Sequence, residues 1–285
     1  MASGLGSALA PRLAAVFEFV LRVYDLRQES KGLPMRFSTG AVDVYVANGC
    51  AGPDLQLCIQ EADAFASWYG LGGHVAVSRW ENGNVWGSDF RDDGGDVDPT
   101  GGADITEIYL YSGHGTCQNP PGSGSPDFIS VCGNFGTPNR VDIGASCGFG
   151  NGRGTLQFFF LDASCPMDLV SITTNWFAPF RGLHMAIGHS GTAVADTLDS
   201  VGRGSQFGAR TAGLPGFLSW LFPQQSVGDA WMATGTIDVQ AGCSAVVVAA
   251  GATESEAVDR RENERIDDQR PDPTANWIAW RWRTR

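Results

Sequence analysis

The sequence predicts an α/β fold in which helices cover a mostly parallel sheet. Apolar runs of strand length recur along the 285 residues, and the first two are separated by a stretch whose apolar residues have helical spacing. A strand–helix–strand unit favours parallel pairing, because the helix returns the chain across one face of the sheet. With 43% hydrophobic residues, the chain can also fill a core of this size. We therefore expect a three-layer α/β/α sandwich with long loop insertions.

The first strand–helix–strand unit is expected between residues 41 and 80. Residues 41–46 alternate in polarity and are rich in β-branched side chains, which predicts the first strand. Asp54 precedes apolar residues at helical spacing and is expected to cap a helix there. The glycine-rich residues 70–73 end that helix, and residues 74–80 are expected to form the second strand.

Two long apolar stretches, residues 103–115 and 154–165, predict the next buried strands. Several consecutive apolar residues suit a strand that is covered on both faces. Residues 277–282 alternate Trp with other residues, which predicts an edge strand docked on the domain. The remaining patterns predict helices at 167–172, 206–221 and 228–233 and buried strands at 183–187 and 243–250.

One main domain is expected, with an extension at each end. Residues 1–38 are predicted to form an N-terminal extension with a helical segment, and residues 39–250 the domain itself. Within it, the Gly-, Pro- and Cys-rich insertion 116–154 has the length of a functional lid or substrate wall. Residues 251–285 combine a charge run at 254–273, predicted to be a solvated linker, with the Trp-rich strand.

The charge and cysteine content narrow the range of partners. A net charge of −12 argues against a nucleic-acid or anionic-membrane surface as the main partner. The apolar residues 13–21 include Glu18, so we expect neither a membrane span nor a clear signal peptide, and the localisation stays open. The seven cysteines lack zinc-site spacing. Their odd number suits three disulfides with one free thiol, as in an exported protein, and buried free thiols are the other interpretation.

Two potentially catalytic side chains stand at the ends of the two long apolar stretches. The first stretch ends in Ser112-Gly113-His114-Gly115 and the second in Leu161-Asp162-Ala163-Ser164-Cys165. Ligands of parallel sheets bind at the carboxyl ends of the strands, so His114 and Cys165 are expected at one rim. An ionised cysteine is a strong nucleophile, and a nearby imidazole can remove its proton. The amides of Gly115 and Cys165 are the expected oxyanion donors.

These two motifs, and the 51 residues between His114 and Cys165, resemble those of the caspase-like cysteine peptidases. That superfamily includes caspases, metacaspases, gingipains, clostripain and legumain. More closely, the chain resembles an uncharacterised bacterial and archaeal family with the same Ser-Gly-His-Gly and Leu-Asp-Ala-Ser-Cys signature. The resemblance covers roughly residues 40 to 250. It implies a caspase-like sandwich and a cysteine endopeptidase whose catalytic residues are His114 and Cys165, acting on a protein or peptide without a cofactor.

The sequence departs from the family pattern near the candidate nucleophile. Caspases have Gln-Ala-Cys-x-Gly around the cysteine, whereas Pro166 follows Cys165 here. Metacaspases use an aspartate two residues before the cysteine to bind a basic P1 side chain, but Asp162 stands three residues before Cys165. A preference for Arg or Lys is therefore a hypothesis. The candidates for the substrate pocket are Asp162, Asp89, Asp98 and His184.

Two other functions are compatible with the same patterns. Pro166, the shifted aspartate and the cysteine-rich insertion leave room for a non-catalytic binding or assembly module built on the caspase-like scaffold. A metal-dependent hydrolase would instead use His114, His184 and aspartates of the loop 81–102. That loop lacks the EF-hand pattern, so no metal site is expected, although Ca²⁺ can order an acidic loop of this kind.

Overall fold

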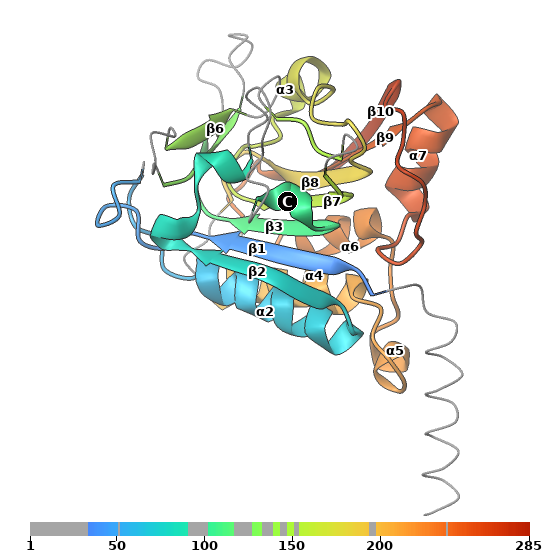
Figure 1. Cartoon of the computed structure of the whole chain (residues 1–285), viewed down its shortest axis with the longest axis horizontal. Helices are drawn as coiled ribbons and strands as arrows, with labels where there is room; N and C mark the ends of the chain where they lie inside the picture. Colours follow the sequence, from blue (N-terminus) through green and yellow to red (C-terminus); the bar gives the residue numbers. More distant parts are fainter. Residues whose placement is uncertain are drawn as a thin grey trace, which may run out of the picture.

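The computed structural model has a seven-stranded sheet at its centre (Figure 1). It describes residues 34–50, 52–90, 102–116, 127–132, 139–142, 147–150, 154–193, 198–237 and 239–285. The strand order is β10–β9–β8–β7–β3–β1–β2. These strands are β1 (Arg36–Ala41), β2 (Val75–Glu81), β3 (Ile108–Ser112), β7 (Phe158–Asp162), β8 (Met185–Ser190), β9 (Ser244–Gly251) and β10 (Trp277–Thr284).

Five neighbouring strands of the sheet run in the same direction. β2, β1, β3, β7 and β8 pair in parallel, and β9 and β10 close the sheet with antiparallel pairs. The predicted α/β fold with a mostly parallel sheet is therefore confirmed. Because β1, β3, β7 and β8 are parallel, their carboxyl ends meet at one edge of the sheet, which we call the carboxyl rim.

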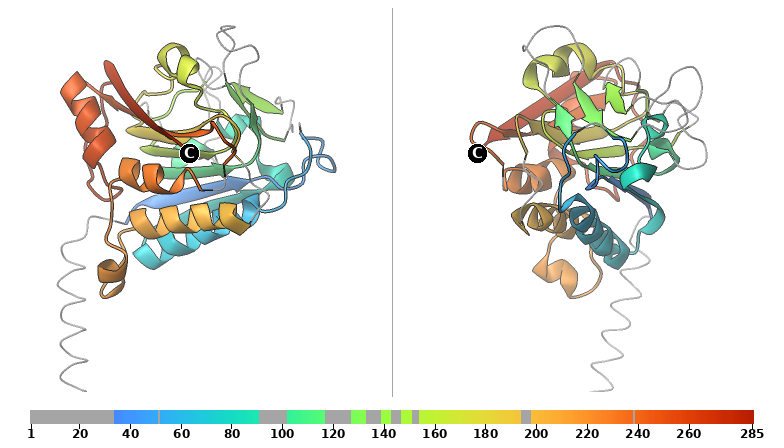
Figure 2. Two further views of the ribbon diagram at one scale, coloured as in Figure 1. Left: turned by 180° about the vertical axis from the view of Figure 1, so that it is seen from behind. Right: turned by 90° about the vertical axis from the view of Figure 1, so that its left-hand side faces the viewer.

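The two faces of the sheet are covered differently (Figures 1 and 2). Helices lie on one face and along β9 and β10, namely α2 (Cys58–Gly72), α4 (Leu198–Thr211), α6 (Val227–Thr234) and α7 (Glu254–Asn263). The opposite face carries α3 (Leu169–Asn175) and a small antiparallel sheet of β4 (Gly115–Thr116), β5 (Phe128–Ser130) and β6 (Arg140–Asp142). Short elements complete the described chain: α5 (Leu218–Leu221) and 3-10 turns at Asn82–Asn84, Gly87–Asp89 and Ala103–Ile105.

Strand β7 shows how the sequence builds these layers. All five of its residues are buried, and alternate side chains of a strand point to opposite faces. Phe158 and Phe160 join the apolar cluster formed with α2, α4 and α6, whereas Phe159 and Leu161 join the cluster on the other face. Burial on both faces explains why the run of apolar residues is continuous. In the part of the chain that the structure describes, no helix is long and apolar enough to cross a membrane.

Helix α4 lies close against α2 because glycines face the contact. A Cβ atom at Gly204 would lie 2.8 Å from the carbonyl oxygen of Glu61, and one at Gly208 would lie 3.3 Å from that of Phe65. Larger residues would force the helices apart. The close approach leaves the neighbouring Arg203 completely buried, within reach of Glu61 on α2 and of strand β7.

The first strand begins earlier than the sequence predicted. β1 spans Arg36–Ala41, so the predicted strand at 41–46 is wrong. Polar side chains take the backbone amides there: Asn82 Oδ1 accepts from the amide of Asp43 at 2.9 Å. Asp43 Oδ1 in turn accepts from the amide of Cys58 at 2.7 Å, where α2 begins. Three residues of the predicted extension 1–38 therefore belong to the sheet.

The charged segment 254–273 begins as a helix, and its prediction as a solvated linker is wrong in this respect. Thr253 caps α7 by accepting from the amide of Glu256 at 3.2 Å. Arg260 is buried and pairs with Glu256 and Glu264, one turn away on each side, at 3.0 Å in both cases. The charges thus pair with one another against the sheet. The predicted C-terminal edge strand is confirmed as β10.

Candidate active site

The loops after β3 and β7 meet at the carboxyl rim. β3 and β7 are paired neighbours, with Ser112 opposite Asp162, and the amide of Gly113 donates to the carbonyl of Asp162 at 3.1 Å. His114 and Cys165 follow these positions by two and three residues. A Cβ atom at residue 115 would lie 2.2 Å from the carbonyl oxygen of Ser164, so only glycine allows the two loops to touch. The structure therefore brings both segments to one rim, as the sequence predicted.

His114 is held by main-chain and phenol groups. Its amide donates to Tyr45 Oη at 2.7 Å, and the two rings lie 4.7 Å apart between centroids. Its Nε2 lies 2.8 Å from the carbonyl oxygen of Pro53. Because a carbonyl only accepts, Nε2 carries the hydrogen of the neutral ring and Nδ1 keeps the lone pair. Gly52 packs closely against the imidazole ring, since a Cβ atom at residue 52 would lie 2.7 Å from Cδ2 of His114.

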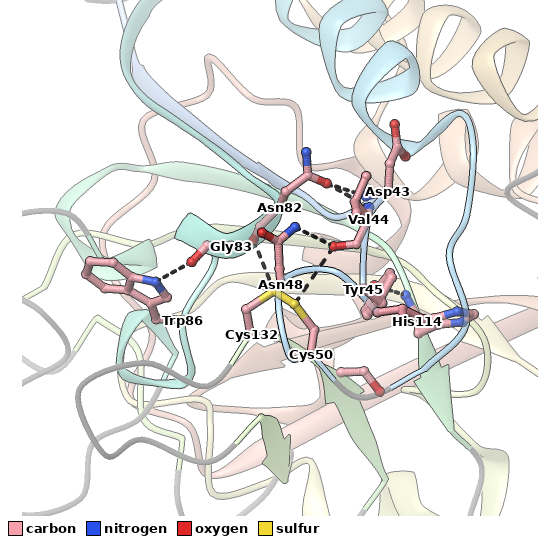
Figure 3. Close-up of a disulfide and its surroundings, with 12 residues drawn as sticks. Asp43, Val44, Tyr45, Asn48, Cys50, Asn82, Gly83, Trp86, His114 and Cys132 are labelled. Atoms are coloured by element: carbon pink, nitrogen blue, oxygen red, sulfur yellow. Dashed lines mark hydrogen bonds between the residues drawn. A yellow bond between two sulfur atoms is a disulfide. The ribbon is translucent and has the colours of Figure 1, made fainter.

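The loop that carries Pro53 is fixed by its own polar contacts and by a disulfide (Figure 3). Asp54, predicted to cap α2, instead accepts from the amides of Tyr45 at 2.7 Å and Val46 at 2.9 Å, which folds the loop back on itself. Cys50 is bonded to Cys132, 82 residues further along the chain. These links hold the carbonyl of Pro53 against the imidazole of His114.

Cys165 is disulfide-bonded, and its partner lies outside the described residues. Only 2% of Cys165 is exposed, and its φ of +64° is in the left-handed region. Its amide donates to the carbonyl of Gly191 at 2.9 Å, so this predicted oxyanion donor already has an acceptor. Among the other described cysteines outside the Cys50–Cys132 disulfide, all are free thiols and buried: Cys58, Cys147 and Cys243.

A buried ionic cluster lies directly behind the rim. The Arg203 guanidinium donates to both carboxylate oxygens of Asp162, at 2.6 and 2.7 Å, and Nε2 of His189 lies 3.2 Å from the same carboxylate. Glu61 accepts from the hydroxyl of Ser112 at 2.7 Å, and its other oxygen lies 3.5 Å from Arg203. One arginine thus joins the ends of β3, β7 and β8 to α2.

The protonation of this cluster follows from burial and charge. Burial alone would raise the pKa of Asp162, but the charge of Arg203 and hydrogen bonds from its neighbours hold that pKa well below its usual range. Burial and the negative charge of Asp162 raise the pKa of Glu61 well above its ordinary value, so Glu61 is the protonated member of the carboxyl pair. Burial also lowers the pKa of His189, which favours its neutral form.

The model of the protein family described as Domain of unknown function (DUF6345) matches residues 42–284 of the chain. The chain belongs to this family. The matched region contains both loops of the rim and every strand from β2 to β10. No curated protein matches the chain.

Of the predicted pocket residues in this DUF6345 domain, Asp162 and Asp89 are buried, with 2% of each exposed. Both oxygens of Asp162 are taken by Arg203, so it supports the rim from behind. Asp89 accepts from the amide of Trp86 at 2.8 Å. Asp98 lies outside the described residues, together with residues 91–101 of the acidic loop proposed for Ca²⁺.

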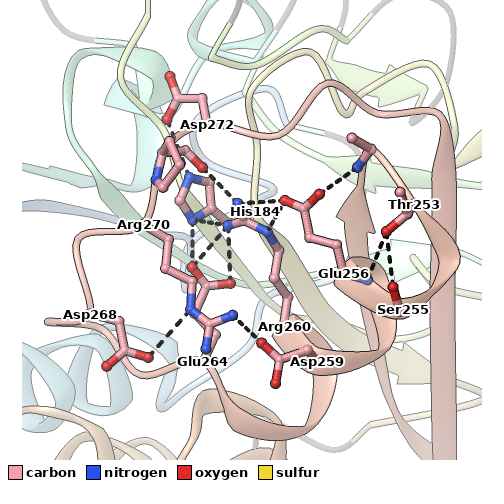
Figure 4. A network of polar contacts seen from close by, with 12 residues as sticks. His184, Thr253, Ser255, Glu256, Asp259, Arg260, Glu264, Asp268, Arg270 and Asp272 are labelled. Atoms are coloured by element: carbon pink, nitrogen blue, oxygen red, sulfur yellow. Dashed lines mark hydrogen bonds and ion pairs between the residues drawn. The ribbon is translucent and has the colours of Figure 1, made fainter.

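His184, expected to approach the rim, lies at the amino end of β8 and therefore at the opposite edge of the sheet. There its Nδ1 is 2.7 Å from Glu264 and 2.9 Å from Arg260, and its Nε2 is 3.2 Å from Asp272 (Figure 4). The placement of His184 in the pocket is corrected accordingly. The histidine of β8 that lies near the carboxyl rim is His189, which belongs to the buried ionic cluster behind the rim.

The predicted metal-dependent hydrolase uses His114, His184 and aspartates of the loop 81–102. His114 follows the carboxyl end of β3 and His184 precedes the amino end of β8, so the two histidines do not share one site. Within the described ranges, no three His, Cys, Asp or Glu side chains are grouped closely enough to hold a metal ion.

Sequence reasoning missed three groups that define the rim. Pro53 acts through its backbone carbonyl, which no residue type reveals. Tyr45 was assigned to a strand, because a loop fixed by side-chain hydrogen bonds can have the polarity pattern of a strand. Arg203 follows a glycine within α4. The only sequence signal for its burial is that a buried Asp162 needs a positive charge beside it.

Proposed function

We propose that this protein is a cysteine-peptidase-like hydrolase that cleaves peptide bonds with Cys165 as nucleophile and His114 as general acid and base. One observation carries the proposal: the hydrogen bond from His114 Nε2 to the carbonyl of Pro53. It leaves Nδ1 as the basic nitrogen of a histidine whose loop touches the loop of Cys165. A nucleophile, a base and a third group that orients the base are the parts of a covalent hydrolase.

The proposed reaction starts from the reduced Cys165. Its thiolate attacks the carbonyl carbon of the scissile peptide, forming a carbon–sulfur bond, and Nδ1 of His114 receives the thiol proton. That proton passes to the leaving amine as the carbon–nitrogen bond breaks, which leaves a thioester on Cys165. Water, deprotonated by the same nitrogen, then hydrolyses the thioester. The amide of Gly115, between the two loops, is the proposed oxyanion donor.

The substrate is proposed to be a protein or peptide. The net charge of −12 favours cationic segments as substrates through long-range attraction. Asp162 does not contribute to this preference, because Arg203 neutralises it. A preference for Arg or Lys at P1 therefore rests on the net charge alone, and a panel of peptides that differ only at P1 tests it.

Hydrolysis of such a panel by the reduced full-length protein tests the proposal. Cys165→Ala and His114→Ala should each lower kcat/KM by at least about 10³-fold, since removing one member of a catalytic set removes most of its effect. Cys147→Ala and Cys243→Ala are matched controls, because both cysteines are buried free thiols. Equal activity in Cys165→Ala and these controls would refute the proposal.

A non-catalytic binding module is the second candidate, and the state of Cys165 favours it. The sulfur is bonded, 2% of the residue is exposed, and its amide is engaged by Gly191. If this candidate is correct, reduced wild-type protein hydrolyses no peptide of the panel. Cys165 then reacts with iodoacetamide no faster than Cys147 in the same reduced sample.

A further inference from the structure

A groove opens at the end of helix α4, where the chain turns back through the segment that carries α5. It has a volume of about 360 Å³, which lies in the range of ligand pockets. Its walls combine polar and apolar side chains, from Gln206, Ala209, Arg210, residues 221–223 and Gln225. We call it the α5 groove.

The α5 groove lies at the amino edge of the sheet, opposite the carboxyl rim. Arg203 and Arg210 are two turns apart on α4, and Arg203 contacts Asp162 at the rim end. Just beyond α4, the carbonyl oxygen of Ala212 lies 3.1 Å from Nε2 of His74, which directly precedes β2. Binding in the groove is therefore separate from the hydrolysis proposed at the rim.

A hydrogen bond and ring packing hold the groove in shape. The amide of Gln225 donates to the carbonyl of Arg210 at 2.8 Å, which ties the returning chain to the last turn of α4. The ring of Phe222 packs against Trp68 of α2, with the ring centroids 5.3 Å apart. The groove is thus formed before a ligand arrives, which lowers the ordering cost of binding.

The apolar wall of the groove continues onto an exposed aromatic surface. No residue of α5 is buried, and the helix projects from the body of the molecule (Figures 1 and 2). Phe217, Trp220 and Leu221 are 74%, 82% and 50% exposed. The amides of Trp220 and Leu221 both donate to the carbonyl of Phe217, so the three side chains belong to one helical turn. Neighbouring exposed apolar side chains of this kind mark an interaction site.

Arg210 brings an uncompensated positive charge to the groove. In the part of the chain that the structure describes, no carboxylate forms an ion pair with its guanidinium. A guanidinium has five N–H donors and no acceptor, and a carboxylate matches its planar fork with two parallel bonds. The net charge of the chain is −12, but charges farther away than about 8 Å are largely screened at physiological salt. The nearby guanidinium therefore favours a ligand that carries a carboxylate.

We infer that the α5 groove is the docking site for a segment of another protein in which an Asp or Glu side chain stands beside aromatic or aliphatic residues. The carboxylate pairs with Arg210, and the apolar side chains cover Trp220 and Phe222. Trp and Arg are enriched among the residues that dominate binding at protein interfaces. An anionic membrane is a poorer match, because it attracts clusters of basic residues, and among the described residues that line the groove only Arg210 is basic.

Selection from a random peptide library tests the inference on the full-length protein. Wild type, the double variant Arg210→Gln/Trp220→Ala and the control Trp282→Ala are each screened against phage-displayed heptapeptides at about 0.15 M NaCl. Trp282 is a matched control, because it is 52% exposed and belongs to β10. Wild type and Trp282→Ala should select the same peptides, in which an acidic residue adjoins apolar ones, and the double variant should not. Circular dichroism checks that all three proteins are folded.

A double-mutant cycle on one selected peptide isolates the charge pair. Fluorescence anisotropy of the labelled peptide measures Kd. Replacing the acidic residue of the peptide by its amide should raise Kd at least about tenfold, and so should Arg210→Gln with the unchanged peptide. The two changes together should cost little more than either alone, since they remove the same interaction. Trp220→Ala should raise Kd at least about tenfold as well.

Three results would overturn the inference. The first is that wild type and the double variant select the same peptides, or none. The second is a cycle in which the two effects are independent, because the carboxylate then binds away from Arg210. The third is another occupant: if wild type but not Trp220→Ala binds phosphatidylcholine vesicles, or dimerises in sedimentation velocity, the surface belongs to a lipid or to a second copy of the chain. None of these results depends on hydrolysis, so the proposed function is tested separately.

Discussion

The two ends of β8 present the same chemistry with different consequences. His184 and His189 are both completely buried, and each meets a carboxylate whose other partner is a buried arginine. At the carboxyl end, Asp162 and Arg203 tie the rim to α4. At the amino end, Glu264 and Arg260 tie α7 and the chain after it to the sheet. Position along the strand, and not residue type, decides which of the two networks lies near the candidate active site.

The largest expected effect comes from breaking the carboxyl-end network. Arg203→Leu leaves the carboxylate of Asp162 buried without its counter-charge, which should lower the free energy of unfolding by about 3–5 kcal/mol. Urea titration followed by Trp fluorescence measures this. Arg260→Leu is the matched control at the amino end, where a similar loss is expected. Only Arg203→Leu should change the rate at which reduced Cys165 is alkylated, and equal rates in both variants would remove the distinction between the networks.

A smaller effect is expected where the two loops of the rim touch. Gly115→Ala places a methyl group 2.2 Å from the carbonyl of Ser164, so the backbones move apart at about 1–3 kcal/mol. Thermal unfolding and alkylation of Cys165 report the two consequences. Gly70 lies inside α2 with open space where a Cβ atom would stand, so Gly70→Ala should instead stabilise the folded protein by about 0.5–1 kcal/mol. A neutral Gly115→Ala would mean that the loops are not in contact.

His189 also makes the stability of the protein depend on pH. Burial lowers the pKa of folded His189, so below about 6.5, its unfolded pKa, the unfolded chain binds a proton that the folded chain does not. The contribution is present above that pH and is lost as the pH falls, by about 1 kcal/mol between pH 7.5 and 5.5. Urea titrations at both values should show a smaller loss for His189→Asn than for wild type. If His189→Asn loses as much stability as wild type, a group other than His189 causes the pH dependence.

The smallest effect on stability is expected at the histidine proposed to be catalytic. His114→Gln removes one hydrogen bond from a partly exposed side chain, worth about 1 kcal/mol or less. His184→Gln disturbs a buried network and should cost about 1–3 kcal/mol. Urea titration compares them, and alkylation of reduced Cys165 should slow only in His114→Gln. A larger loss of stability in His114→Gln than in His184→Gln would mean that His114 has a structural role.

The sequence predicted the parallel sheet and the meeting of the two loops, because both depend on local apolar runs and on strand direction. It failed where side chains replace backbone pairing, as at Asp43 and Asn82, and where charges are buried in pairs, as at Arg260. The left-handed turn at Cys165 could not be predicted from the sequence. Its disulfide could not be predicted either, since seven cysteines permit many pairings. The contact between His114 and the carbonyl of Pro53 could not be predicted either, because every residue has a backbone carbonyl.

Strand β10 also affects how the chain folds during its synthesis. All eight residues of β9 are buried, between β8 on one side and β10 on the other. Until residues 277–284 have been synthesised and have paired with β9, the outer edge of β9 presents unpaired backbone groups beside apolar side chains, a pattern that recruits other chains. The nascent chain is thus prone to aggregate during this interval, and the pairing of β10 with β9 ends it.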